Sequence, residues 1–463
     1  MSGQHSPARD LAARLLNEWS RSGRFADVIL GEALDSSALD PKDRSLAAEL
    51  FLGVLRRRES LDCVLRAFCS RPLKRMSPAV LNILRIGAYQ IIFLARVPSY
   101  AAVDSAVTQA KKLPGGAVHK MVNAVLRSLD RCLAQDSSGD NAEFPRRALP
   151  LAPGNWRRFD HDIFAGIEED PGLHISQVYS CPAWLARRWW ARFDLHDASQ
   201  VAQASVLRGP VVLRPNLLRT SSEELCVGLT NLGLRSGLMS EGLGVWVERI
   251  SVAENQFFQA GHFQPQGPTA MRTGLFTEAQ PGQKILDFCA GLGTKSTHLA
   301  ELMSNEGLIV ASDISAEKLR RAKSNAARLG ISCIQFVHQS QLKERFNPRY
   351  FDMVLVDVPC SNTGVLANRP DVKWRISLED LPELAAKQRD ILLGAIDFLK
   401  PGGSLIYSTC SIEPVENDEF TTGITADCSQ TLTFEKDKQY LPGITSNPAD
   451  WRDGGYMARW RRK

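Results

Sequence analysis

Apolar residues recur at helical spacing through the N-terminal part of the chain. Between residues 8 and 133 they fall three or four positions apart, as at Leu11 and Leu15, and strand-like alternation is absent. Prolines such as Pro41 and Pro78 stand where helix boundaries are expected. This pattern predicts an all-α domain of six or seven helices.

Short apolar runs alternate with helical patterns in the C-terminal half. Runs such as 284–287, 307–312 and 353–356 have the length of buried strands, and a helical pattern at 316–329 lies among them. Strands and helices that alternate in this way are typical of a parallel, doubly wound α/β sheet. We therefore predict a domain of this class at residues 256–463.

A polar stretch and a smaller unit of mixed pattern lie between these two parts. Residues 136–171 are rich in Ser, Asp, Pro and Arg, which predicts a linker. Residues 172–255 contain strand-like runs at 211–216 and 245–248 and a helix start at Ser221. We expect a small α/β unit there.

One predicted helix of this unit combines aromatic and basic residues. Aromatic rings beside arginines can stack on bases and neutralise phosphates, which is one interpretation of the pattern. Burial of Trp184 and Trp189 on one helix face is an equally good interpretation. Arg187, Arg188 and Arg214 are therefore the better candidates for contact with RNA.

Composition narrows the class of protein. At 463 residues and 44% hydrophobic, the chain can bury several cores, and 23% of its residues are charged. No apolar run approaches ~18 residues, and residues 1–5 lack a signal-peptide pattern. We expect a soluble cytoplasmic protein. A net charge of +5 is modest and would suit a polyanionic partner.

The ten cysteines are scattered along the chain. They include no Cys-x-x-Cys pair and no nearby pair of histidines, which argues against a zinc site and against a disulfide framework. We expect free thiols and no metal.

Two predicted strands end in similar chemistry. Asp357 ends one strand, Cys360 lies on the loop after it, and Cys410 follows the strand at 403–408. The carboxyl ends of neighbouring parallel strands share one crevice, so these side chains are expected to converge. A cysteine is more often a small buried apolar residue. Two cysteines and an acid at paired strand ends nevertheless indicate covalent chemistry.

A glycine-bearing turn predicts a nucleoside-cofactor site. The turn follows the strand at 284–287 and opens a helix, and an acid ends the next strand, where it can accept hydrogen bonds from ribose hydroxyls. S-adenosylmethionine (SAM) fits better than NAD or ATP, because the phosphate-binding signature and the third glycine of the dinucleotide fingerprint are missing. The residues of this turn and of the strand ends beside it that are expected to bind the cofactor are Asp287, Cys289, Ala290, Gly291, Gly293, Lys295 and Asp313.

Motifs in both halves resemble known families. Asp357-Val-Pro-Cys360-Ser-x-Thr-Gly364, Arg369-Pro-Asp-Val-Lys-Trp374 and Tyr407-Ser-Thr-Cys410-Ser-x-x-Pro414-x-Glu416-Asn417 resemble the RNA 5-methylcytosine methyltransferases. Leu84-Arg85-Ile86-Gly87-Ala88-Tyr89-Gln90 and similar motifs resemble the NusB family of RNA-binding helical domains. Together they point to the RsmB (Fmu/Sun) branch, which methylates small-subunit (16S) ribosomal RNA.

This resemblance covers nearly the whole chain and implies a multidomain protein. The expected parts are a NusB-like helical domain at 1–135, the linker at 136–171, an RRM-like α/β unit at 172–255 and a Rossmann-like methyltransferase domain at 256–463. RNA is the expected partner, SAM the cofactor, and no membrane, no metal and a monomeric state are expected.

The resemblance adds Gln339 and Asp357 to the residues expected to bind the cofactor, and it also implies catalytic roles. C5 of cytosine reacts poorly with a sulfonium methyl, but a thiolate that adds at C6 turns C5 into a nucleophile. In the resembled family the cysteine of the Thr-Cys motif attacks, which corresponds to Cys410. Cys360 would assist loss of the C5 proton and release, Asp357 would bond near N3 of the ring, and Lys295 would contribute to the same site.

Departures from the family pattern leave an alternative open. Relatives read Cys-Ala-Ala-Pro-Gly-Gly-Lys where this chain has Cys289-Ala-Gly-Leu-Gly-Thr-Lys295, and Gln339 or Ser340 stands in place of an expected acid. A non-catalytic RNA-binding or ribosome-assembly protein on the same scaffold is the second hypothesis. A DNA cytosine methyltransferase fits less well, because its nucleophile lies in the Pro-Cys motif.

Overall fold

The chain forms two compact units in the computed structural model, which describes residues 6–114, 118–139 and 145–463. One unit consists of Met1–Arg208 with Leu366–Leu378, and the other of Gly209–Val365 with Glu379–Lys463. The chain therefore leaves the second unit just after the Cys360 loop and contributes a short segment to the first. None of the described helices has the length and apolar character needed to cross a bilayer.

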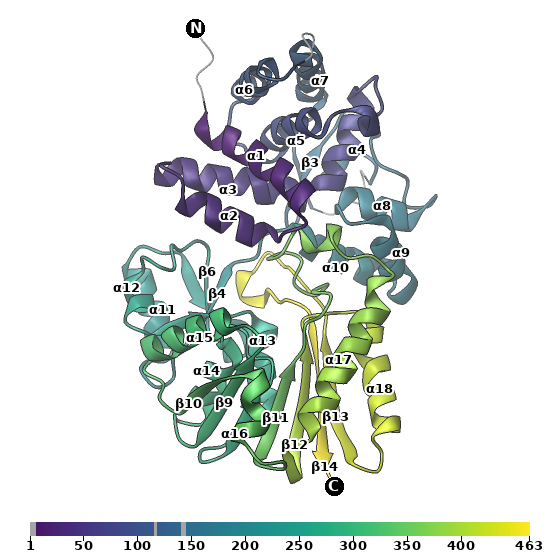
Figure 1. Ribbon diagram of the computed structural model, residues 1–463. Helices are drawn as coiled ribbons and strands as arrows, with labels where there is room; N and C mark the ends of the chain where they lie inside the picture. The colour runs from purple at the N-terminus through teal and green to yellow at the C-terminus, as the bar shows by residue number, and fades with distance from the viewer. Residues whose placement is uncertain (1–5, 115–117, 140–144) are drawn as a thin grey trace. The chain divides into compact units, whose positions relative to one another are not determined.

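The N-terminal helical pattern is confirmed (Figure 1). Asp40 and Ser77 cap the helices that start at Pro41 and Pro78, since each side chain accepts a backbone N–H three residues on. The helix at residues 78–93 is buried on almost every face, which makes it the centre of this unit. Up to residue 132, the described α-helices are α1 (Pro7–Ser22), α2 (Ala26–Asp35), α3 (Pro41–Arg56), α4 (Arg58–Phe68), α5 (Pro78–Phe93), α6 (Ser99–Lys111) and α7 (Val118–Cys132).

The rest of the first unit contains short strands and three more helices. β1 (Ser137–Ser138), β3 (Asn155–Arg158) and β2 (Ala148–Ala152) form an antiparallel sheet in that order. They lie within 136–171, the range predicted as a linker, of which residues 140–144 fall outside the described part of the chain. The helices are α8 (Pro171–Val178), α9 (Ala183–Arg192) and α10 (Leu195–Val206).

A seven-stranded sheet forms the centre of the second unit. Its order is β10-β9-β8-β11-β12-β14-β13, and the first five strands are parallel. The predicted parallel sheet is confirmed for these five strands, whereas β14 runs antiparallel to both of its neighbours. The strands are β8 (Lys284–Asp287), β9 (Leu308–Asp313), β10 (Ile334–His338), β11 (Phe351–Asp357), β12 (Leu399–Thr409), β13 (Leu432–Tyr440) and β14 (Gly455–Arg462).

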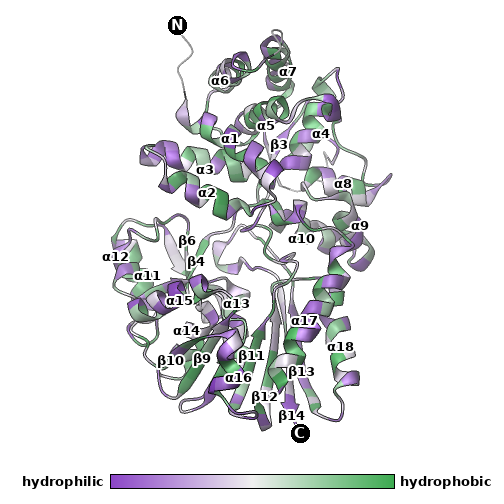
Figure 2. Ribbon diagram, viewed as in Figure 1, coloured by the Kyte–Doolittle hydropathy of each residue, from purple (hydrophilic) through white to green (hydrophobic). Residues whose placement is uncertain are grey.

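Both faces of this sheet are buried, which explains the continuous apolar runs of its strands (Figure 2). Alternate residues of β11 enter different cores: Val354 and Val356 pack on one face, Met353 and Leu355 on the other. The helices that flank the sheet are α14 (Thr294–Leu302) and α15 (Ala316–Leu329) on one side, and α16 (Leu342–Arg345), α17 (Asp380–Ile396) and α18 (Asp418–Asp427) on the other.

A four-stranded antiparallel sheet belongs to the same unit. Its order is β5-β6-β4-β7, with β4 (Val211–Pro215) and β6 (Val245–Val247) close to the runs predicted from the sequence. The predicted helix start at Ser221 is confirmed, because α11 (Ser222–Asn231) begins with a complete capping box to Glu224. The remaining strands are β5 (Ser236–Leu238) and β7 (Phe263–Pro265), and α13 (Pro268–Thr277) leads into β8.

Candidate active site

The predicted cofactor turn lies between the carboxyl end of β8 and the start of α14. Gly291 and Gly293 have φ values of 55° and 73°, a region that favours glycine. The Gly291 N–H donates to Asp313 Oδ2 at 3.0 Å, and the Ala290 N–H donates to the Ser312 carbonyl at 2.8 Å. The turn is thus held against the end of β9 by hydrogen bonds to that strand.

Asp287 is fully buried at the end of β8. Its Oδ2 accepts the Ser296 hydroxyl at 2.6 Å, and its Oδ1 has no partner among the described residues. Burial raises the pKa of this carboxyl to about 7. A buried acceptor without a partner is costly, so this atom is suited to a donor group of a ligand.

The residues present fit SAM. Asp313 offers carboxylate oxygens at the glycine turn, Asp287 Oδ1 offers a second acceptor, and a SAM molecule carries ribose hydroxyls and an amino group as donors. Cys289 lies two residues after Asp287, and burial raises the pKa of its thiol well above the ordinary range, so it is neutral. Gln339 also faces this turn: its Nε2 lies 3.5 Å from the Phe288 carbonyl.

Lys295 and Asp357 form an ion pair beside the cofactor turn. Lys295 Nζ lies 2.7 Å from Asp357 Oδ2. Burial acts to lower the pKa of Lys295, but the charge and the hydrogen bond of Asp357 raise it above its ordinary value. A thiolate at Cys410 is close enough to raise it further. Lys295 therefore interacts electrostatically with both Asp357 and the Cys410 side chain.

The two cysteines predicted to converge do so. Cys360 Sγ and Cys410 Sγ are 3.1 Å apart, although 50 positions separate them. Their surroundings differ, because Cys360 is buried and Cys410 is partly exposed. The hydrogen bond with Cys410, together with burial, raises the pKa of Cys360 well above its ordinary value. Cys410 is consequently the more accessible sulfur of the pair.

Asn362 joins the two cysteine loops and has a left-handed backbone, with φ 58°. Cys410 Sγ donates to its Oδ1 at 3.2 Å, and its Nδ2 donates to the Cys360 carbonyl at 2.6 Å. The sequence motif contains this position as a variable residue, so its role was missed. The sequence signal for this role was a short polar residue in the turn after Cys360. Asparagine tolerates positive φ, and its side chain can bond to nearby backbone groups.

A buried polar network beneath the cysteines was also missed. Glu416 is fully buried, and its carboxylate accepts the Ser361 N–H at 2.9 Å and the Ser411 hydroxyl at 2.5 Å. Gln388 Nε2 donates both to Glu416 Oε1 at 2.8 Å and to the Pro359 carbonyl at 3.0 Å. The signal was present in the Glu416-Asn417 pair of the third motif, to which no role was assigned.

The structure corrects one expected RNA contact. Arg214 is only 3% exposed and donates to both carboxylate oxygens of Glu301, at 2.9 and 2.7 Å. It therefore packs β4 against α14 and is not available to RNA. Arg187 is exposed and pairs with Asp170, while Trp189 is a core residue.

Comparisons with known proteins agree with this architecture. A family model described as 16S rRNA methyltransferase RsmB/F matches residues 275–437, and a NusB family model matches residues 6–131. The probable ribosomal RNA small subunit methyltransferase B of Bacillus subtilis is 30% identical over 415 residues, which are 89% of this chain and 86% of that protein. The ribosomal RNA small subunit methyltransferase B of Shewanella oneidensis is 31% identical over 459 residues, which are 97% and 98% of the two chains.

Solved structures show the same fold. The crystal structure of PH0851 has a TM-score of 0.71 at 19% identity and covers 99% of this chain and 100% of its own. A methyltransferase homolog protein from Pyrococcus horikoshii has a TM-score of 0.51 at 23% identity and covers 64% of this chain and 99% of its own.

The family match and the relatives define this protein as a methyltransferase that depends on SAM, and the sheet order agrees with that class. A NusB domain precedes the catalytic part. The chain belongs to the 16S rRNA methyltransferase RsmB/F family.

Proposed function

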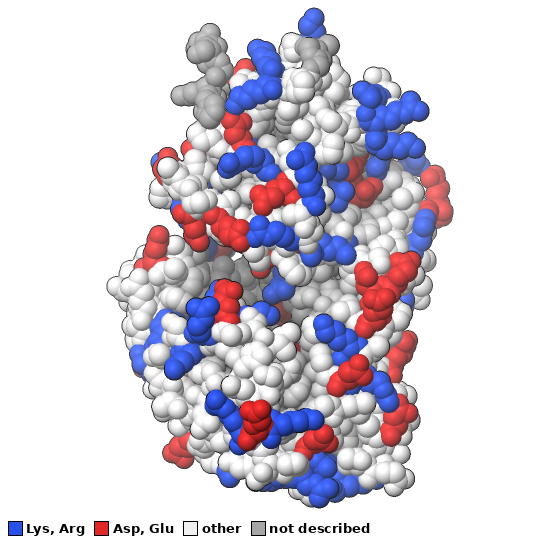
Figure 3. All heavy atoms as spheres, viewed as in Figure 1, with Lys and Arg blue, Asp and Glu red and all other residues white. Residues whose placement is uncertain are grey.

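We propose that this enzyme forms 5-methylcytosine in small-subunit (16S) ribosomal RNA through a covalent adduct between Cys410 and C6 of the target cytosine. The family supports the RNA class, since the relatives from Bacillus subtilis and Shewanella oneidensis are named as ribosomal RNA small subunit methyltransferases. With such a substrate, the enzyme would act in the cytoplasm. On the face shown in Figure 3, basic side chains are interspersed with acidic ones over both units.

The observation that carries the proposal is the sulfur pair beside a fixed cation. Cys410 is the accessible sulfur, Cys360 lies 3.1 Å from it, and the Lys295 ammonium interacts electrostatically with Cys410. A structural cysteine requires neither a second thiol nor a buried ammonium beside it.

The proposed reaction uses each of these side chains. The Cys410 thiolate forms a bond to C6, and the electron pair of the C5–C6 double bond becomes available at C5. Asp357 bonds to the ring near N3 and is oriented by Lys295. SAM, when bound, supplies the methyl group on a sulfonium. The C5 electron pair forms the bond to this methyl group. With the assistance of Cys360, a base or water then accepts the C5 proton, the electron pair of the C5–H bond re-forms the C5–C6 double bond, and the C6–S bond breaks to restore the Cys410 thiolate.

Replacing each cysteine in turn distinguishes the role of Cys410 from that of Cys360. Cys410→Ala should abolish 5-methylcytidine and any covalent complex, because no C6 adduct forms. Cys360→Ala should add to C6 and transfer the methyl group but stall before elimination, so a protein–RNA complex should survive denaturing electrophoresis. Each is incubated with SAM and unmodified 16S rRNA, and nucleosides are measured by mass spectrometry. Cys428→Ala is the control, since Cys428 lies outside the site and should behave as wild type.

A stable complex from Cys410→Ala and none from Cys360→Ala would reverse the two roles. Methylation by wild type at a position other than C5 of cytosine, with no complex from any variant, would reject the covalent mechanism.

A further inference from the structure

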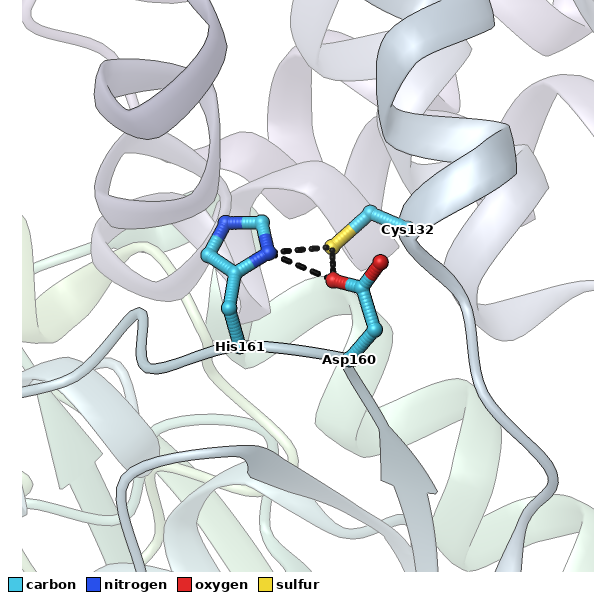
Figure 4. Close-up of side chains that lie close together, drawn as sticks. All are labelled: Cys132, Asp160 and His161. Carbon is cyan, nitrogen blue, oxygen red and sulfur yellow. Dashed lines mark hydrogen bonds and ion pairs between the residues drawn. The ribbon is translucent and has the colours of Figure 1, made fainter.

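Cys132, Asp160 and His161 bring three different metal-ligand atoms together in the first unit (Figure 4). Cys132 Sγ lies 2.9 Å from Asp160 Oδ1 and 3.5 Å from His161 Nδ1, and the last two atoms are 2.5 Å apart. Among the residues that the structure describes, this is the one group of His, Cys, Asp and Glu side chains with such spacing. It lies outside the SAM site, which belongs to the other unit.

The backbone fixes this cluster from both sides. Cys132 is the last residue of α7, and the chain there pairs with the end of β3 through the bridge between Leu133 and Phe159. The Asp160 N–H donates to the Cys132 carbonyl at 2.9 Å, and the Ala134 N–H donates to the Arg158 carbonyl at 3.0 Å. The ligand atoms are thus carried by paired backbone segments, which is the rigid support that a metal site needs.

We propose that these three side chains bind one zinc ion, with a water molecule as the fourth ligand. A thiolate, an imidazole and a carboxylate form a borderline-soft set that suits zinc and not magnesium or calcium. Cys132 is buried, while the side chains of Asp160 and His161 are 57% and 50% exposed, so the fourth position opens to solvent. Binding releases the thiol proton to solvent, and the thiolate and carboxylate charges neutralise the dication.

The distances are compatible with a tetrahedral ion after a small movement of one side chain. Zinc–ligand bonds of about 2.0–2.3 Å place neighbouring ligand atoms roughly 3.3–3.6 Å apart. The sulfur and the imidazole nitrogen already have this separation. Asp160 Oδ1 must move outward from both, and its exposed side chain can rotate without loss of packing.

The Cys132–His161 pair would join the end of α7 to the end of β3. Zinc should therefore stabilise the first unit against unfolding, since binding to the native state adds to its stability. The cysteine pattern argued against a zinc site and no metal was expected, because these ligands are 28 and 29 positions apart and form no Cys-x-x-Cys or paired-histidine motif.

Cobalt titration of the metal-depleted full-length protein tests the proposal. Wild type should bind one equivalent with a thiolate-to-cobalt charge-transfer band and the intense visible bands of a tetrahedral ion, and zinc should displace the cobalt. Cys132→Ser should lose the charge-transfer band. His161→Ala, at an exposed position that does not threaten folding, should weaken zinc binding by more than the roughly 10–100-fold that loss of an outer-shell partner costs.

Two control variants test whether another thiol produces the cobalt band. Cys69→Ser changes a half-buried cysteine of the same unit that belongs to no such cluster, and Cys360→Ser breaks the thiol pair of the other unit. Both should keep the cobalt band. A raised melting temperature with zinc in wild type, and its absence in His161→Ala, gives a readout independent of colour. A band that persists in Cys132→Ser, or equal zinc affinity in wild type and His161→Ala, would show a hydrogen-bonded cluster without a metal and overturn the proposal.

Discussion

The carboxylate of Glu416 accepts the backbone N–H of Ser361 at 2.9 Å. Ser361 directly follows Cys360, and Ser411, which directly follows Cys410, donates its hydroxyl to the same carboxylate. One buried acid therefore holds the loops after β11 and β12 at a fixed separation. This explains why the sulfurs, carried by different strands, lie 3.1 Å apart.

Replacing this acid should impair catalysis because the two loops, and with them the cysteines, would no longer be held at the same separation. Glu416→Gln keeps the shape but turns one acceptor oxygen into a donor that faces other donors. We expect kcat to fall at least about tenfold and the free energy of unfolding to fall by roughly 1–3 kcal/mol. The affinity for SAM should stay within a factor of two. Calorimetry, denaturant unfolding and single-turnover kinetics measure these quantities. Glu419→Gln, at an exposed position of α18, is the matched control, and an unchanged kcat in Glu416→Gln would rule out this role.

The predicted position of the cofactor depends on Asp313. Its oxygens accept the N–H groups of Gly291 and Ser315, at 3.0 and 2.8 Å, and we expect the same carboxylate to accept a ribose hydroxyl. Asp313→Asn keeps the size and removes the charge. A charge-assisted hydrogen bond contributes about 1.5–3 kcal/mol, so SAM should bind roughly 10–150-fold more weakly by calorimetry.

Asp397→Asn is the control for this measurement, because Asp397 is an exposed residue at the end of α17. It should bind SAM as wild type does. Equal affinities in Asp313→Asn and wild type would place the ribose elsewhere.

Local patterns were sufficient to predict much of the site. The strand end at Asp287 and the helix at 316–329 follow from apolar periodicity, and α15 has these bounds. The convergence of Cys360 and Cys410 follows from the rule that parallel strands share a carboxyl edge. Each of these inferences needs only residues that are close in sequence and a general rule of α/β sheets.

Features that depend on distant partners could not be predicted in this way. The insertion of β14 between β12 and β13 depends on pairing with both, and no local signal determines its direction. Arg214 looked exposed because arginine usually is, but Glu301, 87 positions later, neutralises it in the core. The Arg369–Trp374 motif is part of the resemblance to the RNA 5-methylcytosine methyltransferases, and its segment belongs to the first unit.

Asp371 of this segment caps a helix that lies far away in sequence. Its Oδ2 accepts the Ala26 N–H at 3.0 Å, at the start of α2, where Phe25 offers no side-chain cap. Asp371→Ala should lower the free energy of unfolding by about 0.5–2 kcal/mol, the usual cost of a lost N-terminal cap. Asp40→Ala removes the local cap of α3 and gives a reference for the size of the effect. If thermal unfolding of Asp371→Ala matches wild type, this contact does not stabilise the unit.

Lys373 of the same segment should make stability depend on pH. It is fully buried, its Nζ donates to the Arg56 carbonyl at 2.9 Å, and burial lowers its pKa to about 7, with Arg56 and Arg57 acting in the same direction. An unfolded lysine titrates near pH 10.4. Between these values the unfolded chain binds the additional proton, so this group makes the folded state more stable as the pH rises above about 7.

Lys373→Met removes the titrating group and retains most of the buried volume. Between pH 7 and 8.5 the wild-type free energy of unfolding should gain up to about 1.4 kcal/mol per pH unit relative to the variant. The neighbouring Cys181 acts in the opposite direction at higher pH, because burial raises its pKa to about 12, and the measurement therefore stops at pH 8.5. Urea unfolding at three pH values gives both curves. Parallel curves would mean that Lys373 is not forced towards its neutral form, and that the segment tolerates a buried ammonium beside two arginines.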